Sequence, residues 1–184
     1  MHSPSLPGLD TGDGAARGTA IHACFEEVDW IDQGTPDHDA LAAAIRRQFP
    51  RHPAEWVQER LEEFEGYLSL PSIQNLLRAP EVPTVLYREE PFVRRVPGGL
   101  QRAVIDRLVL FLGKDGLPQR AEVIDFKTDK GSSPEEFLLR HEGQYRQYVE
   151  IVAATYGLEH NSVRAILVEL ATGITHHLPE VESG

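Results

Sequence analysis

The 184-residue sequence predicts an α/β fold in which a mixed central β-sheet is flanked by helices, with a helical segment at the N-terminal side. Two changes of pattern indicate this fold. Apolar residues repeat with the helical period as far as residue 80, and the chain then switches to strand-like segments up to residue 127. A helical pattern and a further strand follow, and this order is typical of a sheet packed between helices.

Four helices are expected in the first part of the chain. Residues 18–30 carry apolar side chains at positions i, i+3, i+4 and i+7, so they form a short amphipathic helix. A second helix opens after Pro36, has Asp37 or Asp39 near its start, and runs to Gln48.

Prolines bound the last two helices of this part. Pro53 suits the first turn of the third helix, whose apolar stripe stops at Pro71. Ser72 is the candidate cap of a short fourth helix that ends before Pro80.

The second part of the chain is expected to build the sheet. Pro91 favours an edge or a bend within the first strand, because proline cannot donate to a ladder. Glycine-rich turns at residues 97–99 and 113–116 join the first three strands as hairpins. The expected strand segments are residues 84–90 and 92–96 on either side of Pro91, then 100–112, 119–127, 163–170 and a short one at 174–178.

One long helix is expected between the third and fourth strands. Ser133 and Glu136 form a capping-box pattern with Pro134 at the first helical position. The pattern continues to Gly157, which suits a C-terminal cap, and Gly143 is a candidate break within it.

The length fits one domain over residues 18–178, preceded by a flexible lead-in or linker at residues 1–17 and followed by a tail at residues 179–184. No apolar run approaches a membrane span, and the polar start does not resemble a signal peptide, so a soluble protein is expected. The single cysteine, Cys24, excludes an internal disulfide, a cysteine-based zinc site and an iron–sulfur cluster ligated by this chain alone. A reducing cytoplasm is the simplest compartment.

The net charge of −11 argues against tight, unaided binding of nucleic acid. A bound divalent cation or a partner that delivers the substrate would offset this charge. The basic residues Arg94, Arg95, Arg102 and Arg107 cluster around the strands that carry acids. They are either a nucleic-acid contact or solvated residues at a strand edge, and the sequence leaves both open.

Two acids and a lysine on neighbouring strands carry the chemistry. Asp125 and Lys127 are two residues apart, so they project from the same face of a strand, and the preceding strand carries Asp106 among aliphatic neighbours. Such oxygen-rich sites suit Mg²⁺ or Mn²⁺, and Lys127 would lie near an attacking water or the scissile phosphate. The alternative is a structural salt bridge from Lys127 to Asp125 or Asp129.

Three further features are weak when taken singly. His22 lies in the first turn of the first expected helix, where a packing or capping role is more common than ligation. Glu89 precedes the acid-bearing strands and reads as a charged strand edge. Gln144 and Tyr148 are four residues apart on the late helix and share a face.

Taken in order, these motifs resemble the RecB-family nuclease domain, a restriction-endonuclease-like branch of the PD-(D/E)xK superfamily, most of all the domain at the C-terminus of AddA-type helicase–nucleases. The family pattern reads G-x-x-x-H, E-x-P-F, I-D, D-x-K and Q-x-x-x-Y, and the match spans roughly residues 17–170. The matching residues are Gly18 and His22, Glu89 to Phe92, Ile105 and Asp106, Asp125 to Lys127, and Gln144 with Tyr148.

The resemblance implies a role for each of these positions. His22, Asp106 and Asp125 would ligate the Mg²⁺ or Mn²⁺ ion, and Lys127 would be the catalytic lysine. Gln144 and Tyr148 would position the DNA strand or support the site, and Glu89 would support it nearby. Asp129 and Lys130 are expected to be loop residues.

The resemblance also implies a function: a metal-dependent DNA nuclease, expected to be an exonuclease on single strands or DNA ends in repair or recombination. No phosphate-loop motif is present, so ATP hydrolysis by that route is excluded, and a fused or associated helicase is the expected partner. The chain would be either a free-standing nuclease or an excised C-terminal domain. Two other hypotheses stay open, an inactive nuclease-fold module that docks or regulates a helicase, and a hydrolase of small phosphoesters.

Overall fold

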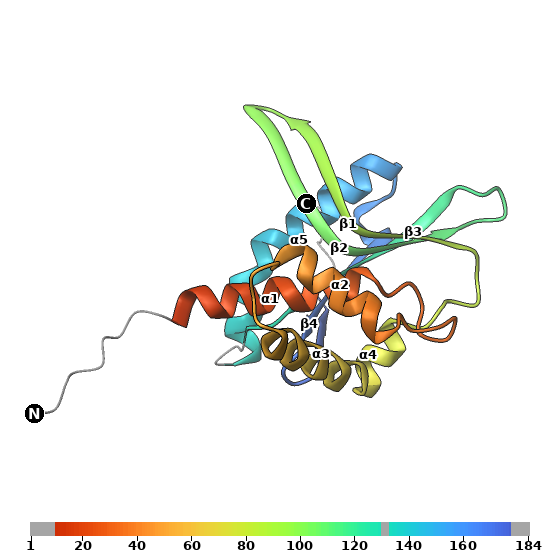
Figure 1. Cartoon of the computed structure of the whole chain (residues 1–184). Coiled ribbons are helices and arrows are strands. Elements are labelled where there is room, and N and C mark those ends of the chain that lie inside the picture. The colour runs from red at the N-terminus through yellow and green to blue at the C-terminus, as the bar shows by residue number, and fades with distance from the viewer. Residues whose placement is uncertain (1–9, 130–132, 178–184) are drawn as a thin grey trace, which may run out of the picture.

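The computed structural model describes residues 10–129 and 133–177, which form one mixed sheet between helices (Figure 1). The strand order follows the chain, β1-β2-β3-β4-β5, and the β3–β4 pair is parallel whereas its neighbours are antiparallel. The predicted α/β class is confirmed. The strands are β1 Thr84–Val96, β2 Gly99–Leu112, β3 Pro118–Lys127, β4 Val163–Glu169 and β5 Ile174–His177.

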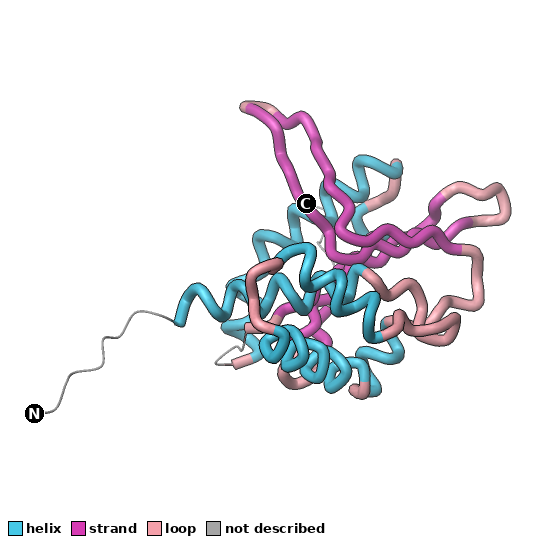
Figure 2. The backbone as a smooth tube through the Cα atoms, in the orientation of Figure 1, coloured by secondary structure: helices cyan, strands magenta, loops and turns pink. Residues whose placement is uncertain are grey.

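Helices from the first part of the chain cover one face of the sheet (Figure 2). They are α1 Asp10–Glu26, α2 His38–Gln48, α3 Ala54–Leu68 and α4 Pro71–Leu76. The ring of Phe25 on α1 stacks on Phe126 of β3 with 4.0 Å between centroids, and Phe64 of α3 packs edge-on against Phe25. These contacts fix α1 directly over the centre of the sheet.

The long helix α5, Pro134–Tyr156, covers the other face and builds a second apolar core there. It begins as the capping box predicts, since the Ser133 hydroxyl accepts the Glu136 N–H at 3.2 Å. It ends at Gly157, whose φ of 66° is the left-handed conformation that glycine adopts easily. Gly143 does not break it, because the flanking turns are anchored by buried tyrosines and aliphatic residues.

Two helix boundaries differ from the prediction. Helix α1 begins at Asp10, before residue 18, and ends at Glu26. Its first turns lack an apolar stripe, so periodicity missed them, but Arg17 anchors this segment by donating to Tyr67 Oη at 2.9 Å. Ser72 does not cap α4, which begins at Pro71; the Ser72 hydroxyl instead donates to the Gly173 carbonyl at 2.6 Å.

The sheet divides at its centre. Pairing between β2 and β3 ends at Arg107 and Ile124, whereas β1 and β2 stay paired to their shared turn. Residues 90–105 therefore form a two-stranded projection, here called the arm, which rises from the sheet in Figure 1. Glu89, at the base of the arm, has a φ of 48°, so the edge strand is distorted at that point.

Arg107 is a structural residue, which neither interpretation of the arginine cluster anticipated. Its side chain is 1% exposed and donates to the backbone carbonyls of Val28, at 2.9 Å, and Asp29. Its guanidinium also lies 4.5 Å from the centre of the Trp30 ring. Burial, with a contribution from Arg88, lowers the pKa of Arg107 to about 10, so it remains charged at neutral pH.

Among residues 10–129 and 133–177, no helix combines the length and apolar character that crossing a membrane requires.

Candidate active site

The site forms where β2 and β3 separate. One carboxylate oxygen of Asp106 accepts the backbone N–H of Phe126 at 2.9 Å, beyond the last β2–β3 backbone pair. The Asp106 side chain thus takes the place of a strand partner and is held at the split. Its remaining lone pairs face the space between α1 and the sheet.

Three elements bring three metal-ligating side chains together. His22 of α1, Glu89 of β1 and Asp106 of β2 offer ligand atoms that all lie within 4.8 Å of one another. The His22 Nδ1 atom lies 3.4 Å from an Asp106 oxygen and 3.9 Å from a Glu89 oxygen. No helix or strand supplies two of these groups, so the cluster exists only when α1 is docked on the sheet.

Gly18, one turn before His22, allows α1 to approach the end of β3. A Cβ atom at position 18 would lie 3.0 Å from the Thr128 hydroxyl oxygen, which is closer than ordinary contact. A Cβ atom there would require the Thr128 side chain or α1 to shift by a few tenths of an ångström. Glycine at position 18 therefore suits the close approach of this turn to the end of β3.

The local potential is strongly negative. Burial alone would lower the pKa of His22, but its contacts with Asp106 and Glu89 outweigh burial and raise that pKa to about 10. Burial and the Glu89 carboxylate raise the pKa of Glu26, which lies one turn after His22 on α1. Carboxylates that resist ionisation around an imidazole that holds its proton indicate a site with an excess of negative charge.

Asp125 and Lys127 of β3 form the second part of the site. The Asp125 side chain is almost fully buried, and one of its oxygens lies 2.8 Å from the Lys127 ammonium. Burial and the nearby Asp106 carboxylate raise the pKa of Asp125, and Lys127 opposes this rise. A buried carboxylate is costly unless it is paired, so the Lys127 ammonium is fixed in place by this contact.

Gln144 and Tyr148 of α5 complete a ring of hydrogen bonds around the lysine. The Lys127 ammonium donates to the Gln144 carbonyl oxygen at 3.1 Å, and the Gln144 amide donates to the Tyr148 hydroxyl at 2.6 Å. The Tyr148 oxygen lies 2.9 Å from the Val104 carbonyl and 3.4 Å from Asp125. These two side chains therefore orient the Asp125–Lys127 pair.

The seven predicted site residues all line one open cavity of about 430 Å³. They are His22, Glu89, Asp106, Asp125, Lys127, Gln144 and Tyr148. One detail of the arrangement differs from the expected one. Glu89, expected only as a support, takes the third place beside His22 and Asp106, while Asp125 is turned toward Lys127.

The prediction missed four of the lining residues, Thr19, Glu26, Gln48 and Val104. Glu26 follows His22 by four residues on α1 and so shares its face, a spacing that could have identified it. Gln48, at the end of α2, carries no such local signal. Asp129 does not line the cavity, and one of its carboxylate oxygens lies 3.0 Å from the Arg140 guanidinium. Lys130 lies outside the described residues.

The donor set fits a hard divalent cation. Two carboxylates and an imidazole nitrogen converge, with a further carboxylate on Asp125 close by, and such ligands suit Mg²⁺ or Mn²⁺. A cation would also neutralise the excess negative charge.

Comparison with models of protein families identifies the superfamily of this chain. The family model described as the PD-(D/E)XK nuclease superfamily matches residues 6–183, which is nearly the whole chain. No curated protein matches the sequence.

Proposed function

This chain belongs to the PD-(D/E)XK nuclease superfamily, and from that premise we propose that it is a Mg²⁺- or Mn²⁺-dependent nuclease that hydrolyses phosphodiester bonds of DNA. The observation that carries the proposal is the position of the Asp125–Lys127 pair beside the His22, Glu89 and Asp106 cluster. A cation site next to a fixed ammonium suits a substrate that is itself an anion.

His22, Asp106 and Asp125 would hold the cation, and the geometry supports Glu89 as a further donor. A divalent ion bound there supplies Lewis acidity, which lowers the pKa of water and offsets charge on the phosphate. The buried position of Asp125 and the N–H bond to Asp106 keep these carboxylates from rotating away.

Lys127 would act on the attacking water and the phosphate. Its ammonium pairs with Asp125 and donates to Gln144, and an ammonium has three N–H donors, so donor capacity remains for an oxygen in the cavity. That N–H can orient a water molecule or donate to a phosphate oxygen as negative charge develops on it. Gln144 and Tyr148 hold this geometry through the hydrogen-bond ring.

Cleavage of labelled DNA in Mn²⁺ tests the proposal. The wild-type protein should cut, and Asp125→Ala and Lys127→Ala should each reduce kcat by about 100-fold or more, the usual loss when one charge-stabilising group is removed. Lys114→Ala is the matched control, because Lys114 is exposed in the turn between β2 and β3. Equal cleavage by all four proteins, or no cleavage by the wild type across pH and metal conditions, would refute the proposal.

We further propose that this nuclease works on single strands or DNA ends, as an exonuclease in DNA repair or recombination. The motif order resembles that of RecB-family and AddA-type nuclease domains, and this resemblance supports a fused or associated helicase as partner and the cytoplasm as the place of action. Linear DNA should be degraded while covalently closed circles of the same sequence survive. Equal degradation of circles would make the activity endonucleolytic.

A second candidate function is an inactive nuclease-fold module that docks or regulates a helicase. The net charge of −11 favours it, because such a domain holds DNA weakly by itself. Calorimetric titration with Mn²⁺ separates the two, since an inactive module need not bind the ion. Mn²⁺ binding that Asp106→Ala abolishes, together with DNA cleavage, excludes this second function.

Hydrolysis of small phosphoesters is the third and weakest candidate. Competition separates it from the first: an unlabelled oligonucleotide should inhibit DNA cleavage at far lower concentration than a mononucleotide does.

A further inference from the structure

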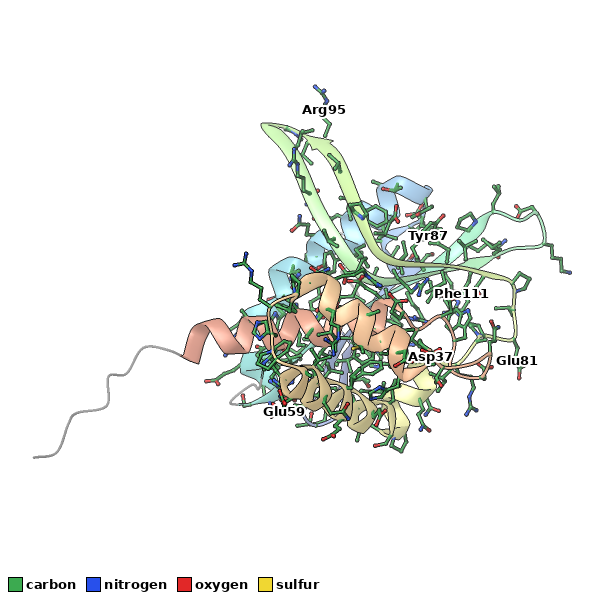
Figure 3. All side chains as sticks on the ribbon, viewed as in Figure 1. Asp37, Glu59, Glu81, Tyr87, Arg95 and Phe111 are labelled. Atoms are coloured by element: carbon green, nitrogen blue, oxygen red, sulfur yellow. The ribbon has the colours of Figure 1, made fainter. Side chains whose placement is uncertain are left out.

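The outward face of the arm combines positive charge with exposed apolar side chains. Cross-strand pairs share a face, and the pairs Val93 with Arg102, Arg95 with Leu100 and Pro91 with Val104 are all exposed. Figure 3 shows Arg95 at the end of the arm, pointing away from the body of the protein.

The opposite face of the arm is occupied. Phe92 is buried in the core under α5, and Arg94 donates to the Glu150 carbonyl of α5 at 3.3 Å. Gln147 of α5 donates to the backbone carbonyl of Arg102 at 2.8 Å. Helix α5 therefore holds the arm in place and leaves its outward face to the solvent.

The composition of the arm contrasts with that of the chain. Residues 90–105 contain three arginines and a single acid, Glu90 at the base of the arm, whereas the whole chain has a net charge of −11. Among the described residues neither Arg95 nor Arg102 forms a side-chain ion pair, so both charges are available to a ligand. A local basic surface on an acidic protein needs an anionic partner to account for it.

Exposed apolar residues also gather on this face. Val93, Leu100 and Val104 are 62%, 56% and 50% exposed, and they make up three of the seven large apolar side chains that are exposed in the described part of the chain. Apolar residues concentrated in this way on a surface usually mark a contact site.

The outward face leads directly into the cavity. Val104 lines the cavity together with Asp106, two residues further along β2. At about 3.4 Å per residue, Arg102 lies roughly 14 Å from Asp106 along the strand, and the position opposite Arg95 lies roughly 20 Å away. A ligand lying along the arm would enter the site from one defined direction.

We propose that the outward face of the arm binds single-stranded DNA and guides it to the cavity, with Arg95 and Arg102 on the phosphates and Val93, Leu100 and Val104 against the bases. This deepens the proposed function and rests on it. A single strand is favoured over a duplex because only unpaired bases present their faces to side chains, whereas a duplex keeps them stacked inside. A length of roughly 20 Å corresponds to about six nucleotides at a spacing of about 3.4 Å each.

Salt dependence of binding is the sharpest test. A fluorescent 12-nucleotide single strand is titrated with Lys127→Ala protein in Mn²⁺, where the metal ligands are intact but cleavage is slowed about 100-fold or more. Adding Arg95→Ala and Arg102→Ala should weaken binding at least tenfold and lower the slope of log K against log salt concentration by about 1.4, since each phosphate contact contributes about 0.7. Adding Lys114→Ala and Arg78→Ala, which removes the same charge from other exposed positions, should leave the slope unchanged.

Replacing the apolar residues of the arm should weaken DNA binding without changing its salt dependence. Replacing Val93 and Leu100 by serine should weaken binding of the single strand several-fold without changing the salt slope, because no phosphate contact is lost. These side chains are exposed, so the variant should fold normally, which circular dichroism checks. A 12-base-pair duplex should show a smaller loss than the single strand.

The outcomes separate this inference from the function on which it rests. Binding that is unaffected by both double variants overturns the guiding role and leaves the arm to a protein partner. Absence of Mn²⁺-dependent hydrolysis of both DNA and bis(p-nitrophenyl) phosphate by the wild type refutes the nuclease function, whatever the arm binds. If the site hydrolyses the small diester and the arginine variants raise KM for 12-nucleotide DNA at unchanged kcat, both are supported.

Discussion

Tyr148 is the residue whose hydroxyl joins α5 to both β2 and β3. Removing it in Tyr148→Phe leaves the Gln144 amide without its acceptor and loosens the Asp125–Lys127 pair. We expect kcat to fall about 10- to 100-fold with little change in KM, the usual cost of losing a group that orients others.

The matched control is Tyr156→Phe, on the same helix, where the ring packs near Tyr87 outside the cavity. A positioning role also predicts a shifted pH–rate profile in Tyr148→Phe. An unchanged profile with an unchanged kcat would contradict the role of the hydrogen-bond ring.

His22 gives metal binding a pH dependence of definite sign. Its pKa is raised to about 10, so the metal-free protein is protonated there at neutral pH and must release that proton to coordinate an ion. Affinity for Mn²⁺ should rise by up to about tenfold per pH unit between pH 6.5 and 8.5.

Calorimetry in two buffers of different ionisation enthalpy measures the released proton directly. His22→Asn should bind more weakly and release about one proton fewer than the wild type. The same protonated histidine stabilises the metal-free fold fully below its unfolded pKa of about 6.5, and this contribution is lost as pH rises through about 10.

At the level of the elements, the hydrogen bonds of Arg107 connect β2 to the segment that follows α1. Arg107→Leu would leave the carbonyls of Val28 and Asp29 without their buried donor, and we expect it to lower the free energy of unfolding by about 3 kcal/mol. Urea denaturation measures this change, and Arg120→Leu, at an exposed position on β3, should cost much less.

The helices and the position of Arg107 show which structural features a local sequence pattern can predict and which it cannot. Periodicity identified α2, α3 and α5 because their buried faces recur at helical spacing and their caps are local. The first turns of α1 and the burial of Arg107 depend on residues far along the chain, such as Tyr67 and Val28, so no local pattern reports them.

Prediction of the site residues was likewise limited to what local sequence patterns report. Seven residues could be named because each belongs to a motif with fixed local spacing. The sequence could not show that Glu89, and not Asp125, lies beside His22 and Asp106. That arrangement depends on the distorted backbone at Glu89 and on the ion pair between Asp125 and Lys127.

For the whole molecule, the proposed cation site predicts a stability that depends on metal. The folded chain gathers acids from α1, β1, β2 and β3, which separate when it unfolds, so Mn²⁺ should favour the folded state. At 100 times its Kd the ion should add about 2.7 kcal/mol to the free energy of unfolding, and EDTA should remove it.

Asp106→Ala provides the comparison, because it removes a ligand from the centre of the cluster. Thermal denaturation of this variant should be insensitive to Mn²⁺. A rise in Tm equal to that of the wild type would place the stabilising ion elsewhere on the protein.

The bond from the Phe126 amide to the Asp106 carboxylate makes one nitrogen a natural reporter. Its proton is held by a side chain that would also bind the ion, not by a strand. In an ¹⁵N-labelled sample, its resonance should shift when Mg²⁺ is added, and its exchange with deuterated solvent should slow as Asp106 becomes fixed. Occupancy of the proposed cation site could thus be followed through a single backbone signal, without any substrate.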